Sequence, residues 1–273
     1  MKKLTVVFAL LLIFSTLFSQ EAIKFTMGLL PKKSYDQTLV QKTKIEFSLD
    51  SATNKNYQSH SNVSKPPLMG EQGVRITSII HTGVINKQTG KMPVTMTIID
   101  VDSNAIKFLN PGTLFIGNAG LNEIPVYDSV SGINLDANHK LLMLKVLSNL
   151  SKISLPSASL KPGQYDTVNT SLNNPMGGTE KMEFITTYHL KSIQGSTAFF
   201  DIKVDIHLNI EKKDKSIPGV GTGEGLMEYD LQNHYPSLYN LSYQIKVTQT
   251  KDGRNTDMKM TTNMLNTCKV HAL

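Results

Sequence analysis

Cysteine and arginine are almost absent from this sequence, and each shortage excludes a class of structure. Cys268 is the one cysteine among 273 residues, so the chain cannot form an internal disulfide. The sequence favours a structural role for Cys268, as a small apolar residue of the last strand. The alternative is a thiol that reacts or that pairs with another chain. Arg75 and Arg254 are the only arginines, and the lysines are scattered. Because nucleic-acid sites gather arginine and aromatic side chains along one element, the net charge of +6 indicates a solvated surface and no nucleic-acid partner.

Motifs that carry catalysis or bind metal ions are also missing. The sequence has no G-x-S-x-G nucleophile elbow, no S-x-x-K pair and no H-E-x-x-H helix. None of the seven histidines lies two, three or four residues from another, so no local metal pair exists. His189 and His207 are expected on the polar outer face of neighbouring strands. We expect no catalytic residue, no metal site and no cofactor, and an enzyme site assembled from distant residues stays open.

The stretch GVGTGEGLMEYD, residues 219–230, places glycine at every second position. Its spacing fits neither the dinucleotide motif G-x-G-x-x-G nor a P-loop, in which a lysine must follow. Period two instead predicts a strand whose inward face carries the glycines and two larger residues. Such glycines allow a sharp bend, let a neighbouring aromatic lie over the strand, or leave a gap that holds a ligand. The residues of this candidate binding strip are Gly219, Gly221, Gly223, Gly225, Met227 and Tyr229.

Residues 1–19 have the three-part pattern of a secretory signal peptide. Lys2 and Lys3 precede a mostly apolar run at 4–14, and small or polar residues follow it. The run is too short to span a bilayer comfortably, which takes about 20 apolar residues. Cleavage is expected between Ser19 and Gln20, which gives an exported chain, periplasmic or secreted. No later apolar stretch is long enough to span, so the mature chain is not expected to cross a membrane.

Alternation of apolar and polar residues predicts long, half-buried antiparallel strands in both halves of the chain. In the C-terminal half, turn signals separate the strands and indicate a meander. In the N-terminal half, a hairpin is expected around the turn NKQTGK, and a long loop is expected between Asp50 and Gln72. The clearest expected strands are 42–49, 73–85, 92–102, 124–129, 182–190, 200–210, 239–248 and 256–265.

One amphipathic helix is expected at 135–150, with Asp136 as its N-cap. Its apolar stripe comprises Met143, Val146, Leu147 and Leu150, which must be buried, most simply against the sheet. The predicted fold is therefore mainly β, a curled antiparallel sheet or half-barrel with one main helix packed on it. Residues 20–273 are expected to form one β-rich domain, with two halves at about 20–155 and 156–273 as the alternative.

Three short stretches, DSA, DSV and DTV, match the O-glycosylation signal of Bacteroidota-type bacteria. The acceptor residues would be Ser51, Ser129 and Thr167. Ordinary turn chemistry of Asp followed by Ser or Thr explains the same pattern equally well.

The stretches FSQ, LLPKKSYDQTLVQKTKIEFS, VYDS, LKPGQYDTVN and GTGEGLMEYDLQN occur in this order along the chain. Together they resemble a family of uncharacterised, exported, β-rich proteins of Bacteroidota-type bacteria. The resemblance covers most of the mature chain and supports export and a β-rich fold, but it implies no known activity. The sequence departs from the family at PKKSY, because members tend to have glycine before the tyrosine of the first strand. A looser likeness, of fold only, is to periplasmic half-barrels that carry lipids or lipoproteins.

The function best favoured by these features is non-catalytic binding of a hydrophobic ligand outside the cytoplasm. A curled sheet with one apolar helix can hold such a ligand in its concavity, and the twelve methionines suit an adaptable apolar surface. The alternative is a structural or interaction module of the cell envelope, which pairs its strand edges with a partner protein. An enzyme ranks third, because no motif supports it.

Overall fold

The computed structural model describes residues 22–49, 68–103, 109–133, 135–150, 155–173, 181–212, 215–251 and 254–273. The expected signal peptide, its cleavage site at Ser19 and Gln20, and the acceptor Ser51 lie outside these residues. Within them, no helix is both long and apolar enough to cross a bilayer.

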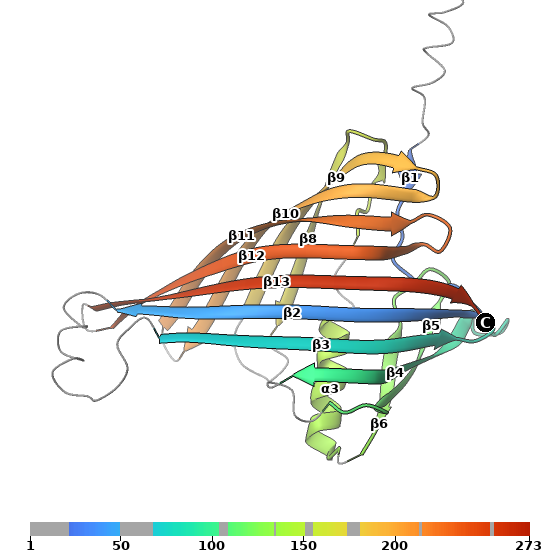
Figure 1. The fold of residues 1–273 in the computed structure, drawn as a ribbon, viewed down its shortest axis with the longest axis horizontal. Helices are drawn as coiled ribbons and strands as arrows, with labels where there is room; N and C mark the ends of the chain where they lie inside the picture. Colours follow the sequence, from blue (N-terminus) through green and yellow to red (C-terminus); the bar gives the residue numbers. More distant parts are fainter. Residues whose placement is uncertain are drawn as a thin grey trace, which may run out of the picture.

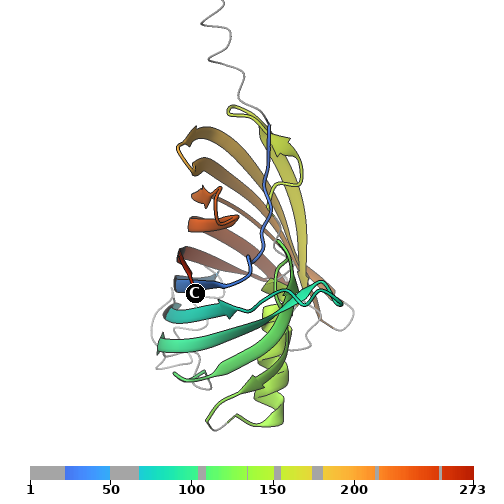
Figure 2. The same ribbon diagram turned by 90° about the vertical axis from the view of Figure 1, so that its right-hand side faces the viewer.

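Eleven antiparallel strands form one curled sheet that is not closed on itself (Figures 1 and 2). Its strand order is β6-β5-β4-β3-β2-β13-β12-β11-β10-β9-β8, so β6 and β8 are the two edges. The predicted fold class is confirmed. The strands are β2 (Lys33–Leu49), β3 (Leu68–Thr82), β4 (Lys91–Ser103), β5 (Leu114–Gly120), β6 (Val126–Ser131), β8 (Tyr165–Asn173), β9 (Lys181–Gln194), β10 (Thr197–Lys212), β11 (Lys215–Asp230), β12 (Tyr235–Lys251) and β13 (Arg254–Ala272).

The middle of this sheet is the pair formed by β2 and β13, which joins the two halves of the chain. Their register runs without a shift from Ala272 opposite Lys33 to Thr256 opposite Leu49. Both strands are longer than alternation predicted, and β13 continues past the expected end at residue 265. Residues 68–72 of the loop expected between Asp50 and Gln72 belong to β3, and residues 50–67 lie outside the described part of the chain. β5 was not predicted.

The concave face of the sheet carries two separate clusters of buried side chains. One cluster lies on the C-terminal strands and includes Phe200, Ile202, Met227 and Tyr229, among others. The other lies on β2–β6 and β13 and includes Tyr35, Met92, Val94 and Phe115. Each half of the sheet therefore buries its own apolar core, and several inward-facing residues of β2 and β13 are only partly covered, although Thr262 among them is buried.

The helix α3 (Ala137–Leu150) packs beside β6 on the N-terminal half of the sheet, as Figure 1 shows. Asp136 caps it, because its Oδ1 accepts a hydrogen bond of 2.8 Å from the His139 N–H. Met143 is the most deeply buried residue of the helix, and Leu144 and Leu147 pack against the same cluster. The predicted apolar stripe was wrong at Val146, whose side chain is exposed. The buried face of the helix is centred on Met143 and includes Leu144 and Leu147, and Val146 lies outside it. The side chain of Leu150 lies outside the described residues.

An N-terminal strap, defined here as residues 22–32, crosses one end of the curled sheet (Figure 2, blue). It begins with β1 (Ile23–Lys24), which pairs with β7 (Ser159–Leu160) in a separate two-stranded sheet. Phe25 packs edge-on against the rings of Phe200 and Tyr229, with centroids 4.9 and 5.2 Å away.

The strap is also held by hydrogen bonds at both ends. The Tyr229 hydroxyl donates to the Thr26 carbonyl at 2.6 Å and accepts from the Thr26 N–H at 3.3 Å. Further along, the Leu29 N–H donates to the Glu123 carbonyl, and the Tyr35 hydroxyl accepts from the Leu30 N–H at 2.7 Å. The strap therefore ties β11 of the C-terminal half to the β5–β6 turn of the N-terminal half.

We expect Tyr229→Phe to loosen the strap, because it leaves the half-buried Thr26 N–H and carbonyl without their partner. The free energy of unfolding should fall by about 1–3 kcal/mol, measured by urea titration. The control is Tyr165→Phe, in an exposed tyrosine of β8, which should stay within about 0.5 kcal/mol of the unchanged protein. Equal stability of the two variants would show that the two hydrogen bonds between Tyr229 and Thr26 do not stabilise the fold.

Candidate functional site

The glycines of residues 219–225 lie in the middle of β11, between β10 and β12, and face the concave side of the sheet. Each is opposite an apolar or aromatic residue of β12, as Gly223 is opposite Tyr243. Met227 and Tyr229 continue the same face and are fully buried. We call Gly219, Gly221, Gly223 and Gly225 the glycine strip.

At three of the four glycines a side chain would collide with the backbone of β12, and at Gly219 it would first meet the Val247 side chain. A Cβ atom on Gly223 would lie 2.5 Å from both the Ser242 carbonyl oxygen and the Tyr243 Cβ. Gly221 and Gly225 would meet the carbonyl oxygens of Gln244 and Asn240 in the same way. The glycines therefore permit β12 to fold in over β11, which is the sharp bend that one reading of the sequence proposed.

Aromatic side chains from the flanking strands meet over this bend. The rings of Tyr243 on β12 and Phe184 on β9 have centroids 6.4 Å apart, although β10 and β11 separate their strands. In a flat sheet three strand spacings would hold those backbones about 14 Å apart. The hydroxyls of Tyr239 and Tyr188 are hydrogen-bonded across the same gap, and burial raises the pKa of Tyr239 to about 12. Direct ligand binding by the glycine strip stays a prediction.

A different part of the concave face is apolar and only half-buried. It lies on β2 and β13, where Met258, Met260 and Met264 pack against the cluster of the C-terminal strands, and we call it the concave strip. Phe47 at its far end is 37% exposed. Because paired residues of β2 and β13 lie side by side, Ile45 is next to Met260 and Phe47 is next to Met258. The concave strip comprises Leu39, Gln41, Thr43, Ile45, Phe47, Met258, Met260, Met264 and Asn266.

Neutral polar groups interrupt the apolar residues of the concave strip. The Gln41 Nε2 donates to the Thr43 Oγ1 at 3.3 Å, and the Thr43 and Thr262 hydroxyls are 3.1 Å apart. Thr262 is also hydrogen-bonded to the Tyr243 hydroxyl. These four side chains form a continuous chain of hydrogen bonds across three strands on the inner face.

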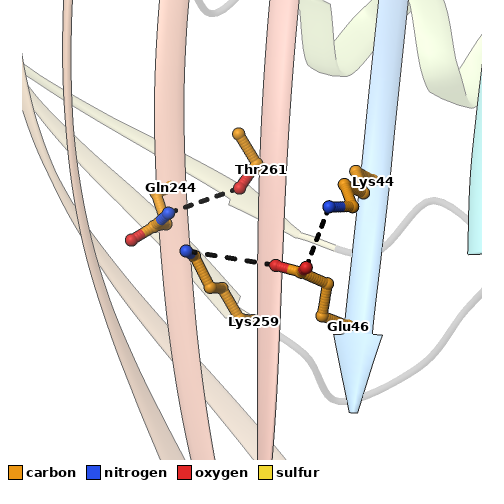
Figure 3. A network of polar contacts seen from close by, with 5 residues as sticks. All are labelled: Lys44, Glu46, Gln244, Lys259 and Thr261. Carbon is orange, nitrogen blue, oxygen red and sulfur yellow. Dashed lines mark hydrogen bonds and ion pairs between the residues drawn. The ribbon is translucent and has the colours of Figure 1, made fainter. Parts of the chain in front are cut away.

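The outer face of the same strands carries the charges instead (Figure 3). The Lys44 Nζ is 2.9 Å from one oxygen of Glu46, and the Lys259 Nζ is 4.0 Å from the other. The neighbouring pair, Gln244 and Thr261, is joined by a hydrogen bond of 3.3 Å. The Lys44 ammonium holds the pKa of Glu46 below its ordinary value. Both lysines point away from the concavity, so charge is segregated to the convex side.

Cys268 lies in β13 with a buried side chain, as expected for a small apolar residue of the last strand. Burial raises the pKa of its thiol to about 12. Since the thiolate is the nucleophilic form, the thiol is inert at neutral pH.

His189 and His207 lie far apart on the outer face. His189 is opposite Asp201, and its ring stacks on that of Tyr165 with the two ring centroids 4.2 Å apart. His207 is opposite Glu183. The described part of the chain contains no group of three side chains that could hold a metal ion.

The two acceptor residues that the structure describes lie on the two edge strands and are exposed. Ser129 is in β6 and Thr167 is in β8. Asp166, which precedes Thr167, has a structural role of its own. Its Oδ2 accepts hydrogen bonds from the Ser157 and Ala158 N–H groups at 2.6 and 3.0 Å. The DTV stretch is therefore explained in part by a cap on residues 157–158, and glycosylation stays a prediction.

The sequence reading missed the β2 side of the concave strip as a site. Its signal is present in LVQKTKIEF, where Leu39, Gln41, Thr43 and Ile45 are uncharged while Lys42 and Lys44 alternate with them. The other row is visible in TDMKMTTNML, where Met258, Met260 and Met264 fall on one side of a strand. Only the pairing of β2 with β13 brings the two rows together.

Comparison with known proteins finds distant structural neighbours only. No family model and no curated protein matches the chain. A protein of Bacteroides fragilis assigned as exported, with a YmcC-like fold, is 11% identical, with a TM-score of 0.25 over 87% of this chain and 97% of its own. The outer membrane protein OpdK from Pseudomonas aeruginosa is 6% identical, with a TM-score of 0.23 over 86% and 99%. The pilotin–secretin complex AspS–GspD from ETEC is 10% identical, with a TM-score of 0.23 over 98% and 53%. TM-scores this low carry no functional argument, and the first neighbour shares only the description of an exported protein with the family that the sequence resembles.

We expect Gly223→Ala to destabilise the protein, because the new methyl group meets the Ser242 carbonyl of β12. The loss should be about 1–3 kcal/mol, the usual range for overpacking, in the free energy of unfolding by urea titration. Gly73→Ala in β3 is the matched control, since a Cβ there has open space and should leave stability unchanged or slightly raised. Tolerance of alanine at both positions would refute the bend.

The Asp166 cap predicts a pH dependence. Hydrogen bonds, first from Ala158 and then from Ser157, lower the pKa of Asp166 in the folded chain. The stabilisation is therefore complete above the unfolded pKa of about 3.9 and is lost as the pH falls through the lower folded pKa. Asp166→Asn should lower the urea midpoint at pH 7 and make less difference at pH 3.

The matched control for that measurement is Asp128→Asn, in the exposed DSV stretch of β6. The change in urea midpoint that Asp128→Asn causes should be the same at pH 7 and at pH 3. A stability gap for Asp166→Asn that is as large at pH 3 as at pH 7 would show that the carboxylate charge is not what stabilises the cap.

Proposed function

We propose that this protein binds a hydrophobic ligand without catalysis, in the concavity of its curled sheet, and that it does so after export to the periplasm or the outside of the cell. The single observation that carries the proposal is the concave strip. It is a row of partly buried, mostly apolar side chains on the inner face of one sheet, and its three methionines pack against the cluster of the C-terminal strands while part of their surface stays exposed.

The composition of the strip suits a flexible apolar ligand. Met258, Met260 and Met264 are unbranched and adaptable, so their side chains can repack around an acyl chain. Ile45 and Phe47 extend the same surface toward the end of the sheet that the strap does not cross. Partly exposed apolar area of this kind gains free energy when a ligand removes it from water, at about 25 cal/mol per Å².

The alternative, an envelope module that pairs with a partner protein, is favoured by one observation. β8 is an edge strand of nine residues, and Asp166 is its one charged residue. Edge strands that avoid pairing usually carry lysine or proline, and β8 has neither. Envelope pull-down with and without a lysine at exposed Asn169 would test this second function.

The hydrophobic-ligand function predicts a lipid-sized mass bound to the mature chain. Native mass spectrometry, on protein purified from its own envelope fraction without detergent, should show that mass, and denaturation should remove it. Met260→Asp places a charge in the concave strip and should reduce the occupied fraction at least tenfold. Asn263→Asp, which adds the same charge on the outer face of β13, should keep the occupancy unchanged.

The outcome that would overturn this function is a ligand-free mass in the unchanged protein. Equal occupancy in Met260→Asp and Asn263→Asp would place the ligand elsewhere and reject the concave strip. Thermal unfolding of both variants, followed by circular dichroism, establishes that each is folded before the comparison is made.

A further inference from the structure

We propose that the ligand of the concave strip is an acyl lipid with an uncharged, hydrogen-bonding head group, as opposed to a fatty acid or another lipid with a charged head. This inference rests on the proposed function and deepens it, because it names the chemical class of the ligand. It follows from which side chains the sheet turns inward.

The described inward positions of the four strands that form and flank the strip carry no formal charge. Every inward position of β2 from Tyr35 to Phe47, and of β13 from Met258 to Val270, is apolar, aromatic, thiol, hydroxyl or amide. The same holds for the facing positions of β3 from Gly70 to Ile80 and of β12 from Tyr239 to Val247. An ionised head group at the strip would find no opposite charge on these four strands to pair with.

The charged residues of β2 and β13 lie on the outer face of the sheet. Lys42, Lys44 and Glu46 of β2 alternate with the inward residues, as do Asp257 and Lys259 of β13. Segregation of charge to one face makes the inner face a low-polarity surface, and an unpaired ion placed there loses its hydration without compensation. The inner face therefore discriminates against charged heads of either sign.

Neutral hydrogen-bonding groups on the same face provide a place for an uncharged head. Gln41 and Asn266 lie at diagonal positions on β2 and β13, because Gln41 pairs with Met264 and Asn266 pairs with Leu39. Thr43 is the next inward residue along β2, already part of the chain of hydrogen bonds to Thr262. Amide and hydroxyl groups both donate and accept, so they match an amide, ester or hydroxyl head.

From a head group at Gln41 and Asn266, the apolar surface extends in one direction only, toward Ile45 and Phe47. Beyond Thr43 the inward residues are Ile45 and Phe47 on β2, beside Met260 and Met258 on β13. In the other direction the strip ends against the buried cluster that contains Tyr35. A head at Gln41 and Asn266 thus places the chain across the two methionines, toward the end opposite the strap.

The test compares three probes that share a twelve-carbon chain: dodecanamide, dodecanoate and dodecylammonium. Binding is measured at pH 7.5 by isothermal titration calorimetry, below the concentration at which each probe forms micelles. The expected result is that dodecanamide binds at least tenfold more tightly than both ions. Dodecanoate or dodecylammonium binding as tightly as the amide would overturn the inference and leave the proposed function standing. Binding of none of the three, together with a ligand-free native mass, would overturn both.

A gain-of-function variant tests the position of the head. Gln41→Lys places an ammonium group at the proposed head site and should shift the preference from dodecanamide toward dodecanoate by at least tenfold. Gln244→Lys is the matched control, because Gln244 is a glutamine on the outer face of β12 and should change neither affinity. An unchanged preference in a folded Gln41→Lys protein would reject Gln41 as the head site.

Discussion

The pairing of β13 with β2 is the contact on which the rest of the architecture depends. It joins strands from the two ends of the chain over the whole length of β2, without a bulge. Without it the C-terminal meander and the N-terminal strands would be two separate sheets, each with two exposed edges. The pairing also creates the concave strip, because it sets Ile45 beside Met260 and Phe47 beside Met258. The two strands are far apart in the sequence, so the loop-closure cost of pairing them is large and must be offset by the long ladder of hydrogen bonds.

Curvature is supplied at a different place, between β11 and β12. Four glycines at alternate positions remove every Cβ atom from one stretch of the inner face, and the β12 backbone occupies the vacated space. Tyr243 then reaches over the strip to meet Phe184, and the C-terminal half acquires a dense core. The free energy lost by placing glycine in a strand is offset by the packing that the bend permits.

The two halves use different means to cover their apolar faces. In the C-terminal half the sheet folds on itself and the strap inserts Phe25, whereas in the N-terminal half α3 lies against the inner face through Met143. In both halves the covering elements lie toward the sides of the sheet, so several inward-facing side chains of β2 and β13 are only partly covered. The uncharged, half-buried surface between them is a consequence of this arrangement, and it is where the proposed ligand would gain most from leaving water.

The sequence by itself determined the local elements. Alternation identified β10, β11 and β12, and Asp136 marked the start of α3, because period two and helix capping are properties of neighbouring residues. It also indicated that the glycine strip faces inward with Met227 and Tyr229. Only the tertiary structure decided the β2–β13 pairing, the course of the strap and the exposure of Val146. These depend on contacts between residues far apart in the chain, and no local pattern of charge or hydrophobicity specifies which strand becomes the neighbour of which. The concave strip belongs to this second class, since its two rows are visible separately in the sequence and become one surface only when β13 returns to β2.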